Sequence, residues 1–190
     1  MKHIYPVLFL TLLSCVLLAG CVSEAGEATL VIAVRDSPKT TDIGTISSLN
    51  LTISEVSVHR SDVGEPVNEG EEEMMAVENG NDTSGWFVVV DKPQTVDLIQ
   101  LQNVSEVIGQ EALEAGNFTQ IRLAIMSGTI TVNDTDHDLS VPSGVLKLNR
   151  GFVLVPGETL TLTLDFNVER SIVHTGAGSF KLQPVIAVLG

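Results

Sequence analysis

The chain has 190 residues, of which 44% are hydrophobic, and its net charge is −14. An acidic surface disfavours nucleic-acid binding, because phosphate groups require a basic stripe for affinity. The length allows one domain to bury a core without disulfides or a structural metal. The same charge also serves plain solubility, so it excludes one class of partner without identifying another.

The first 21 residues are typical of an exported lipoprotein. A basic start precedes an apolar run over residues 4–19, which is shorter than the roughly 20 residues that span a bilayer. Leu18-Ala19-Gly20-Cys21 then resembles a lipobox, in which cleavage precedes a lipid-modified cysteine. We therefore expect a signal peptide at 1–20, a tether at 21–28 and a lipid anchor on Cys21 at the outer face of the cell membrane. An uncleaved membrane anchor is the alternative.

Residues 29–190 are expected to form a single domain of short strands and turns. Within it, the stretch 49–58 changes phase, because its apolar residues are Leu49, Leu51, Ile53 and then Val56 and Val58. A period of two cannot change face without an extra residue, so a β-bulge is predicted near Ser54-Glu55.

Further strands are predicted from alternation and turn signals. They cover residues 86–90, 95–99, 118–125, 129–132, 145–148, 152–155, 159–166 and 180–189, with another around 172 and a hairpin tip at 133–136. Residues 159–166 alternate most clearly and are predicted to be a half-buried antiparallel strand. One short helix is predicted at 105–114. Many strands with little helix favour an all-β antiparallel sandwich.

Residues 61–85 form an acidic, low-complexity stretch that is expected to be a mobile surface loop. Calcium binding there, or at Asp134, Asp136 and Asp138, is an alternative, but neither stretch has the complete spacing of a calcium loop. A solvated charge run and a polar hairpin tip explain the two stretches. We therefore predict no metal site.

Several phrases taken together resemble one known family. They are Arg35-Asp36-Ser37-Pro38, residues 53–59, residues 95–103, residues 115–123, Leu164-Asp165-Phe166 with Glu169-Arg170-Ser171, and residues 182–186. As a set they resemble the "domain of unknown function 4382" family of archaeal and bacterial lipoproteins. The resemblance implies a transthyretin-like or carbohydrate-binding-like β-sandwich at the cell surface. It implies no activity, since the family has none assigned.

Five of the nine asparagines stand in Asn-x-Ser/Thr sequons, more than chance spacing produces. These glycosylation candidates are Asn50, Asn81, Asn103, Asn117 and Asn133. An excess of sequons fits an exported chain in a host that glycosylates asparagine, which for a lipobox protein indicates archaea.

No nucleophile with a neighbouring base can be recognised, and the histidines at 59, 137 and 174 have no reason in sequence to converge. We therefore expect neither enzymatic activity nor a cofactor. The expected function is a lipid-anchored surface module for binding or structure, with the membrane and possible envelope proteins as partners. The alternative is a glycan-binding module that uses Trp86, the single tryptophan, as a platform. An ordinary core tryptophan is the competing interpretation.

Overall fold

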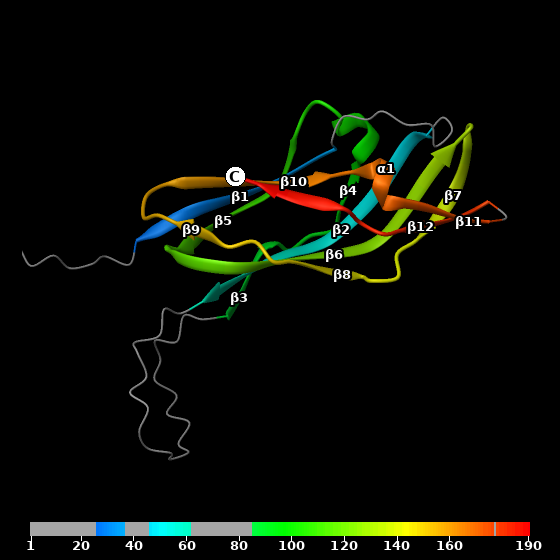
Figure 1. Ribbon diagram of the computed structural model, residues 1–190. Helices are drawn as coiled ribbons and strands as arrows, with labels where there is room; N and C mark the ends of the chain where they lie inside the picture. Colours follow the sequence, from blue (N-terminus) through cyan, green and yellow to red (C-terminus); the bar gives the residue numbers. More distant parts are fainter. Residues whose placement is uncertain (1–25, 37–45, 62–84, 177) are drawn as a thin grey trace, which may run out of the picture.

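The computed structural model describes residues 26–36, 46–61, 85–176 and 178–190 (Figure 1). The expectations for the signal peptide, Cys21, Asn81 and nearly all of the acidic run lie outside these residues. The first strand begins at Glu27, inside the stretch predicted as a tether. Among the described helices, none has the length and apolar character needed to cross a membrane.

Strands account for most of the described chain. In order, the elements are β1 (Glu27–Asp36), β2 (Ile46–Ser61), β3 (Gly85–Val90), β4 (Gln94–Asp97), the 3₁₀-helix η1 (Leu98–Leu101), β5 (Glu106–Glu114), β6 (Gly116–Val132), β7 (Thr135–Ser140), β8 (Val145–Leu148), β9 (Phe152–Leu154), β10 (Thr159–Phe166), α1 (Val168–Ser171), β11 (Ile172–Gly176), β12 (Ser179–Leu182) and β13 (Ile186–Leu189).

The strands form two sheets that stack as layers, with β7, β11 and β12 at one end (Figure 1). The smaller sheet has the order β13-β10-β1-β5. The larger has the order β11-β12-β7-β6-β2-β3, with β4 paired to β2, and with β8 and β9 paired to β6. Apolar side chains from both sheets, among them Leu30, Leu51, Ile121 and Leu164, are fully buried and form the core. The expected all-β sandwich is confirmed.

The predicted β-bulge in β2 is also confirmed. Ile53 pairs with Ile125 of β6, and Glu55 pairs with the next residue, Ala124, so Ser54 is the extra residue. The apolar residues on both sides of the bulge are fully buried: Leu49, Leu51, Ile53, Val56 and Val58. The extra residue therefore keeps both apolar stripes on the core face.

The predicted helix at 105–114 is wrong, since this segment is the strand β5 and pairs antiparallel with β1. Its few apolar positions, Val107, Ile108 and Leu113, fit either period, and pairing with a buried strand decides the outcome. The one described α-helix is instead α1, where Asn167 caps the first turn by accepting a hydrogen bond from the Arg170 N–H.

Two strand pairings are parallel, although antiparallel sheets were predicted. β10 has the expected buried residues Leu162 and Leu164, but it pairs in parallel with β1 and antiparallel only with β13. β7 and β12 are parallel as well. Side-chain alternation indicates which face of a strand is buried and carries no information about the direction of its neighbour.

Several strand boundaries also differ from the prediction, two of them in the second half of the domain. β6 runs unbroken through Ser127-Gly128, with a register irregularity opposite Thr52 in place of the predicted gap. The last predicted strand is divided into β12 and β13 around Pro184. Proline has no N–H to donate to a sheet ladder, so it ends the first of these two strands.

Several chain segments meet at one end of the sandwich, which we call the N-terminal end. The carbonyl of Gly26 accepts a hydrogen bond from the Ala115 N–H between β5 and β6 at 2.9 Å. Arg60 near the end of β2 forms an ion pair with Glu114 at 2.6 Å. Residue Arg60 also pairs with Gly85, the first residue of β3. The start of the fold and the start of β3 therefore lie at the same end.

Candidate functional site

A row of aromatic and polar side chains lies on the outer face of the larger sheet, close to the N-terminal end. Trp86 in β3 lies opposite His59 in β2, and His59 lies opposite Gln120 in β6. Residues that pair in register point to the same face of a sheet, and all three are partly exposed. The row therefore faces away from the core.

A second row lies on the same face, at the position two residues before His59 in β2. Ser57 lies opposite Arg122 in β6, and Arg122 lies opposite Lys147 in β8. The two rows together provide five functional side chains, which we call the Arg122 cluster: Trp86, His59, Gln120, Arg122 and Lys147. The cluster extends over the adjacent strands β3, β2, β6 and β8.

The side chain of Arg122 reaches across β2 to the indole of Trp86. Its guanidinium carbon lies 3.5 Å from the ring centroid, which is a cation–π contact. Because β2 separates the two strands, their backbones are about 10 Å apart. The residue between them is Ser57, whose small side chain is only 3% exposed. A serine at this position leaves room for the arginine to cross.

The indole of Trp86 has a second ring neighbour. The His59 ring centroid lies 5.0 Å from that of the indole, with the planes tilted by 58°. Trp86 is thus a partly exposed residue, but the guanidinium covers one face of its ring. The residue considered in the sequence as an alternative platform for sugar stacking therefore has a cation on that face.

Neither cation of the cluster forms an ion pair within the described part of the chain. The Nε atom of Arg122 is buried and has no hydrogen-bond partner there. Lys147 is exposed directly opposite Arg122, and like charges in register destabilise a sheet. In a chain of net charge −14, the cluster brings together two cations that form no ion pair with any described residue.

Further polar groups border the two cations. The Nε2 of Gln120 donates a hydrogen bond to Oδ1 of Asn149 at 2.7 Å. The Nδ1 of His59 lies 3.2 Å from Oγ1 of Thr119. Amide, imidazole and hydroxyl groups can exchange hydrogen bonds with the hydroxyl groups of a ligand. The cluster therefore places two cations beside groups that can form hydrogen bonds.

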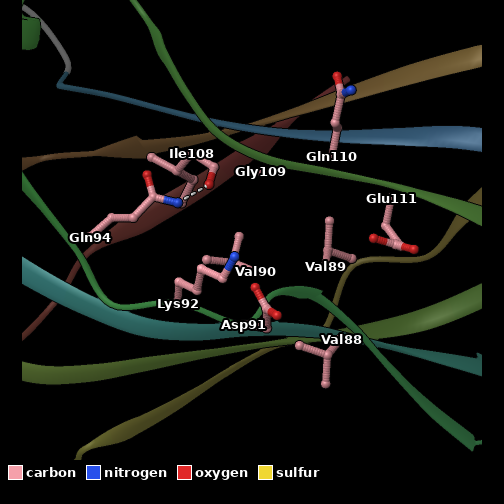
Figure 2. Close-up of a pocket in the computed structure, with 10 residues that line it drawn as sticks. All are labelled: Val88, Val89, Val90, Asp91, Lys92, Gln94, Ile108, Gly109, Gln110 and Glu111. Carbon is pink, nitrogen blue, oxygen red and sulfur yellow. Dashed lines mark hydrogen bonds between the residues drawn. The ribbon is translucent and has the colours of Figure 1, made fainter.

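A separate cavity of about 400 Å³ opens where the edge strands β3 and β5 approach each other (Figure 2). Its polar lining includes Asp91, Lys92 and Glu111. In Figure 2 the Gln94 side chain donates a hydrogen bond to the carbonyl of Ile108, which links β4 to β5. This amide therefore already serves the fold.

Gly109 controls how closely the two edges of this cavity approach. A Cβ at this position would lie 2.6 Å from Cγ2 of Val90 and 2.9 Å from the carbonyl oxygen of Val89. The glycine is thus explained by tight packing of β5 against β3. The cavity is a seam between the sheets, and the Arg122 cluster is the stronger candidate site.

The four sequon asparagines that the structure describes do not gather at one place. Asn50 lies in β2 and donates a hydrogen bond from its amide to Oγ of Ser48 at 2.9 Å. The exposed ones are Asn103, Asn117 and Asn133. Asn133 occupies the predicted hairpin tip with a φ of 49°, which fits a tight hairpin turn.

The histidines are divided between two places. His59 belongs to the Arg122 cluster, whereas His137 and His174 each lie 5.1 Å from the ring of Phe180 at the far end of the larger sheet. Asp136 accepts a hydrogen bond from Thr131 at 2.7 Å. Within the described ranges, no three His, Cys, Asp or Glu side chains gather closely enough to hold a metal ion.

A family model described as "Domain of unknown function (DUF4382)" matches residues 27–184. The chain belongs to this family. The matched region of the DUF4382 domain begins with β1 and includes every residue of the Arg122 cluster. No curated protein and no solved structure matches the chain. The family resemblance seen in the sequence is therefore confirmed, and it brings no established activity.

Sequence reasoning singled out Trp86 in this DUF4382 domain but missed its partners Arg122, Gln120 and Lys147. The missed signal is the alternation in β6, where the outward residues Gln120 and Arg122 alternate with the buried residues Ile121 and Leu123. That pattern places both side chains on the outer face. It does not reveal that Trp86 lies within reach.

Proposed function

We propose that this chain is a lipid-anchored protein of the outer cell surface that acts, without enzymatic activity, as a binding or structural module. The observation that carries the proposal is the motif Leu18-Ala19-Gly20-Cys21. Cys21 precedes Gly26 by five residues, a distance of at most about 18 Å when extended. A lipid with two acyl chains on Cys21 would hold the N-terminal end of the sandwich at the membrane.

The other cysteine of the chain provides a matched control for this anchor. We expect Cys21→Ser to move the protein from the membrane fraction to the soluble fraction, whereas Cys15→Ser leaves it membrane-bound. Mass spectrometry of the membrane-extracted wild type should show Cys21 at the N-terminus with a lipid mass. An intact Met1, or a free thiol at Cys21, contradicts the proposal.

A second candidate function is glycan binding through the Arg122 cluster. Three observations support it: a partly exposed aromatic ring, neighbouring amide and imidazole groups, and a position on an open sheet face. Protein sites for sugars combine aromatic contact with hydrogen bonds to hydroxyl groups. The module would then hold envelope or extracellular polysaccharide close to the membrane.

This second function is tested by measuring the binding of neutral and acidic polysaccharides to the full chain in neutral detergent. We expect at least one class to bind, and Trp86→Ala to weaken that binding. The matched control is Phe152→Ala, which removes another partly exposed ring from the same sheet. Equal weakening by both variants would indicate a general loss of structure and would remove the support for the cluster.

A further inference from the structure

We infer that the Arg122 cluster recognises the carboxylate or sulfate groups of an acidic glycan. The inference rests on the proposed glycan-binding function and adds the chemical class of the sugar. Its basis is the arrangement of Arg122, Trp86 and Lys147 on one sheet face. Three features of that arrangement point to an anionic ligand.

The first feature is the way in which the guanidinium of Arg122 is held. Stacking on Trp86 uses the flat face of the group and fixes its orientation. The N–H donors along its edge are then the groups that can meet a planar anion in bidentate fashion. The partnerless Nε shows that the described residues do not satisfy this guanidinium. Because this Nε is itself buried, the Nη groups of the partly exposed side chain are the donors that a ligand could reach.

The second feature is the position of Lys147. It lies directly opposite Arg122, and neither residue has an acidic partner in the described part of the chain. An anion between the two side chains would convert their repulsion into attraction. The other described arginines of the sheets behave differently, since Arg35 and Arg60 are paired with Asp165 and Glu114.

The third feature is the shape and composition of the surface. The cluster extends across four strands of an open sheet, which suits an extended polymer. Gln120 with Asn149, and His59 with Thr119, provide further hydrogen-bonding groups beside the cations. A sugar acid presents hydroxyl groups next to its charged group, so it complements both kinds of partner.

The test compares dextran sulfate and polygalacturonate with neutral dextran, using the full chain in neutral detergent. We expect the two acidic polymers to bind and neutral dextran to bind at least about tenfold more weakly, because charge-assisted hydrogen bonds are lost. Arg122→Gln should weaken acidic-polymer binding by about tenfold. Added salt should weaken it as well. Binding of the polymer to the cluster can be followed through the fluorescence of Trp86, the single tryptophan.

Two further variants keep the experiment decisive. Arg170→Gln removes an exposed arginine from α1, outside the cluster, and should leave the affinity nearly unchanged. Lys147→Gln removes the second, exposed cation, and should weaken binding even if Arg122→Gln fails to fold. An equal loss with Arg170→Gln and Arg122→Gln would indicate unspecific charge attraction and would overturn the inference.

The remaining outcomes separate this inference from the function on which it rests. If only neutral dextran binds, glycan binding stands and the acidic specificity is wrong. If no polysaccharide binds, both are wrong. Arg122-dependent binding to phosphatidylglycerol vesicles alone would assign the cluster to lipid headgroups.

Discussion

Two arginines on opposite sheets show how differently this fold treats a positive charge. Arg35 in β1 of the smaller sheet lies in register with Asp165 of β10, and its Nη2 donates to that carboxylate at 2.7 Å. Arg122 in β6 of the larger sheet has a serine and a lysine in register. It stacks on Trp86 instead.

The hydrogen bond to Asp165 and the attraction of its carboxylate raise the pKa of Arg35. A raised pKa means that this contribution to stability is complete below the ordinary arginine pKa and is lost only at still more alkaline pH. The ion pair of Arg35 with Asp165 therefore stabilises the fold throughout the range of pH in which the protein would be studied. Arg122, by contrast, has no ion-pair partner among the described residues and is held on a partly exposed ring.

Phe118, on the inner side of β6, is a core side chain whose removal gives a reference value for loss of stability. It is 2% exposed, stacks on Phe152 at 5.0 Å and meets Phe87 edge-on. We expect Phe118→Ala to lower the free energy of unfolding by about 3–5 kcal/mol, because it leaves a cavity. Urea denaturation measures this loss. A change below about 1 kcal/mol would mean that the layer under the cluster is loosely packed.

The second-largest loss of stability is expected at Asp36, the residue after Arg35. Asp36 is 1% exposed, and its Oδ1 accepts a hydrogen bond from the Val168 N–H at 3.1 Å. We expect Asp36→Ala to cost about 1–3 kcal/mol of unfolding free energy, because it leaves a buried backbone donor without this acceptor. The exposed Asp138 serves as the control. Equal losses for the two aspartates would contradict a specific role for the end of β1.

How far the sequence leads can be seen in β2. The change of phase between Ile53 and Val56 predicts the bulge, because burial on one face is a strong local constraint. The segment 105–114 lacks such a constraint. Its sparse apolar residues permit helix or strand, and only the neighbouring β1 selects the strand. Local patterns thus predict the buried face well and strand partners poorly.

The candidate site could be predicted only in part. Trp86 attracts attention because it is the single tryptophan. Its contact with Arg122 depends on β2 lying between β3 and β6, and on a register that several irregularities shift. Each irregularity moves a side chain to another row. The chemistry of the cluster therefore arises from long-range pairing, which no single stretch of sequence contains.

The smallest effect on stability is expected at Arg122. It tests whether Arg122, unlike Arg35, contributes little to the stability of the fold. Arg122→Ala removes a cation–π contact worth about 0.5–1 kcal/mol at an exposed site. The variant also removes two unfavourable features, a buried Nε without a partner among the described residues and the repulsion from Lys147. Their removal offsets part of the loss. We therefore expect the free energy of unfolding to fall by less than about 1 kcal/mol.

The same variant has a spectroscopic readout that stability alone does not move. Removing Arg122 uncovers one face of the only indole, so the tryptophan emission should shift to longer wavelength as water reaches the ring. Arg122→Lys should give an intermediate spectrum, because an ammonium covers the ring less completely than a planar guanidinium. An unfolding loss as large as that of Asp36→Ala would show that Arg122, like Arg35, belongs to the fold. A small loss with a clear spectral shift would leave its charge free for a ligand.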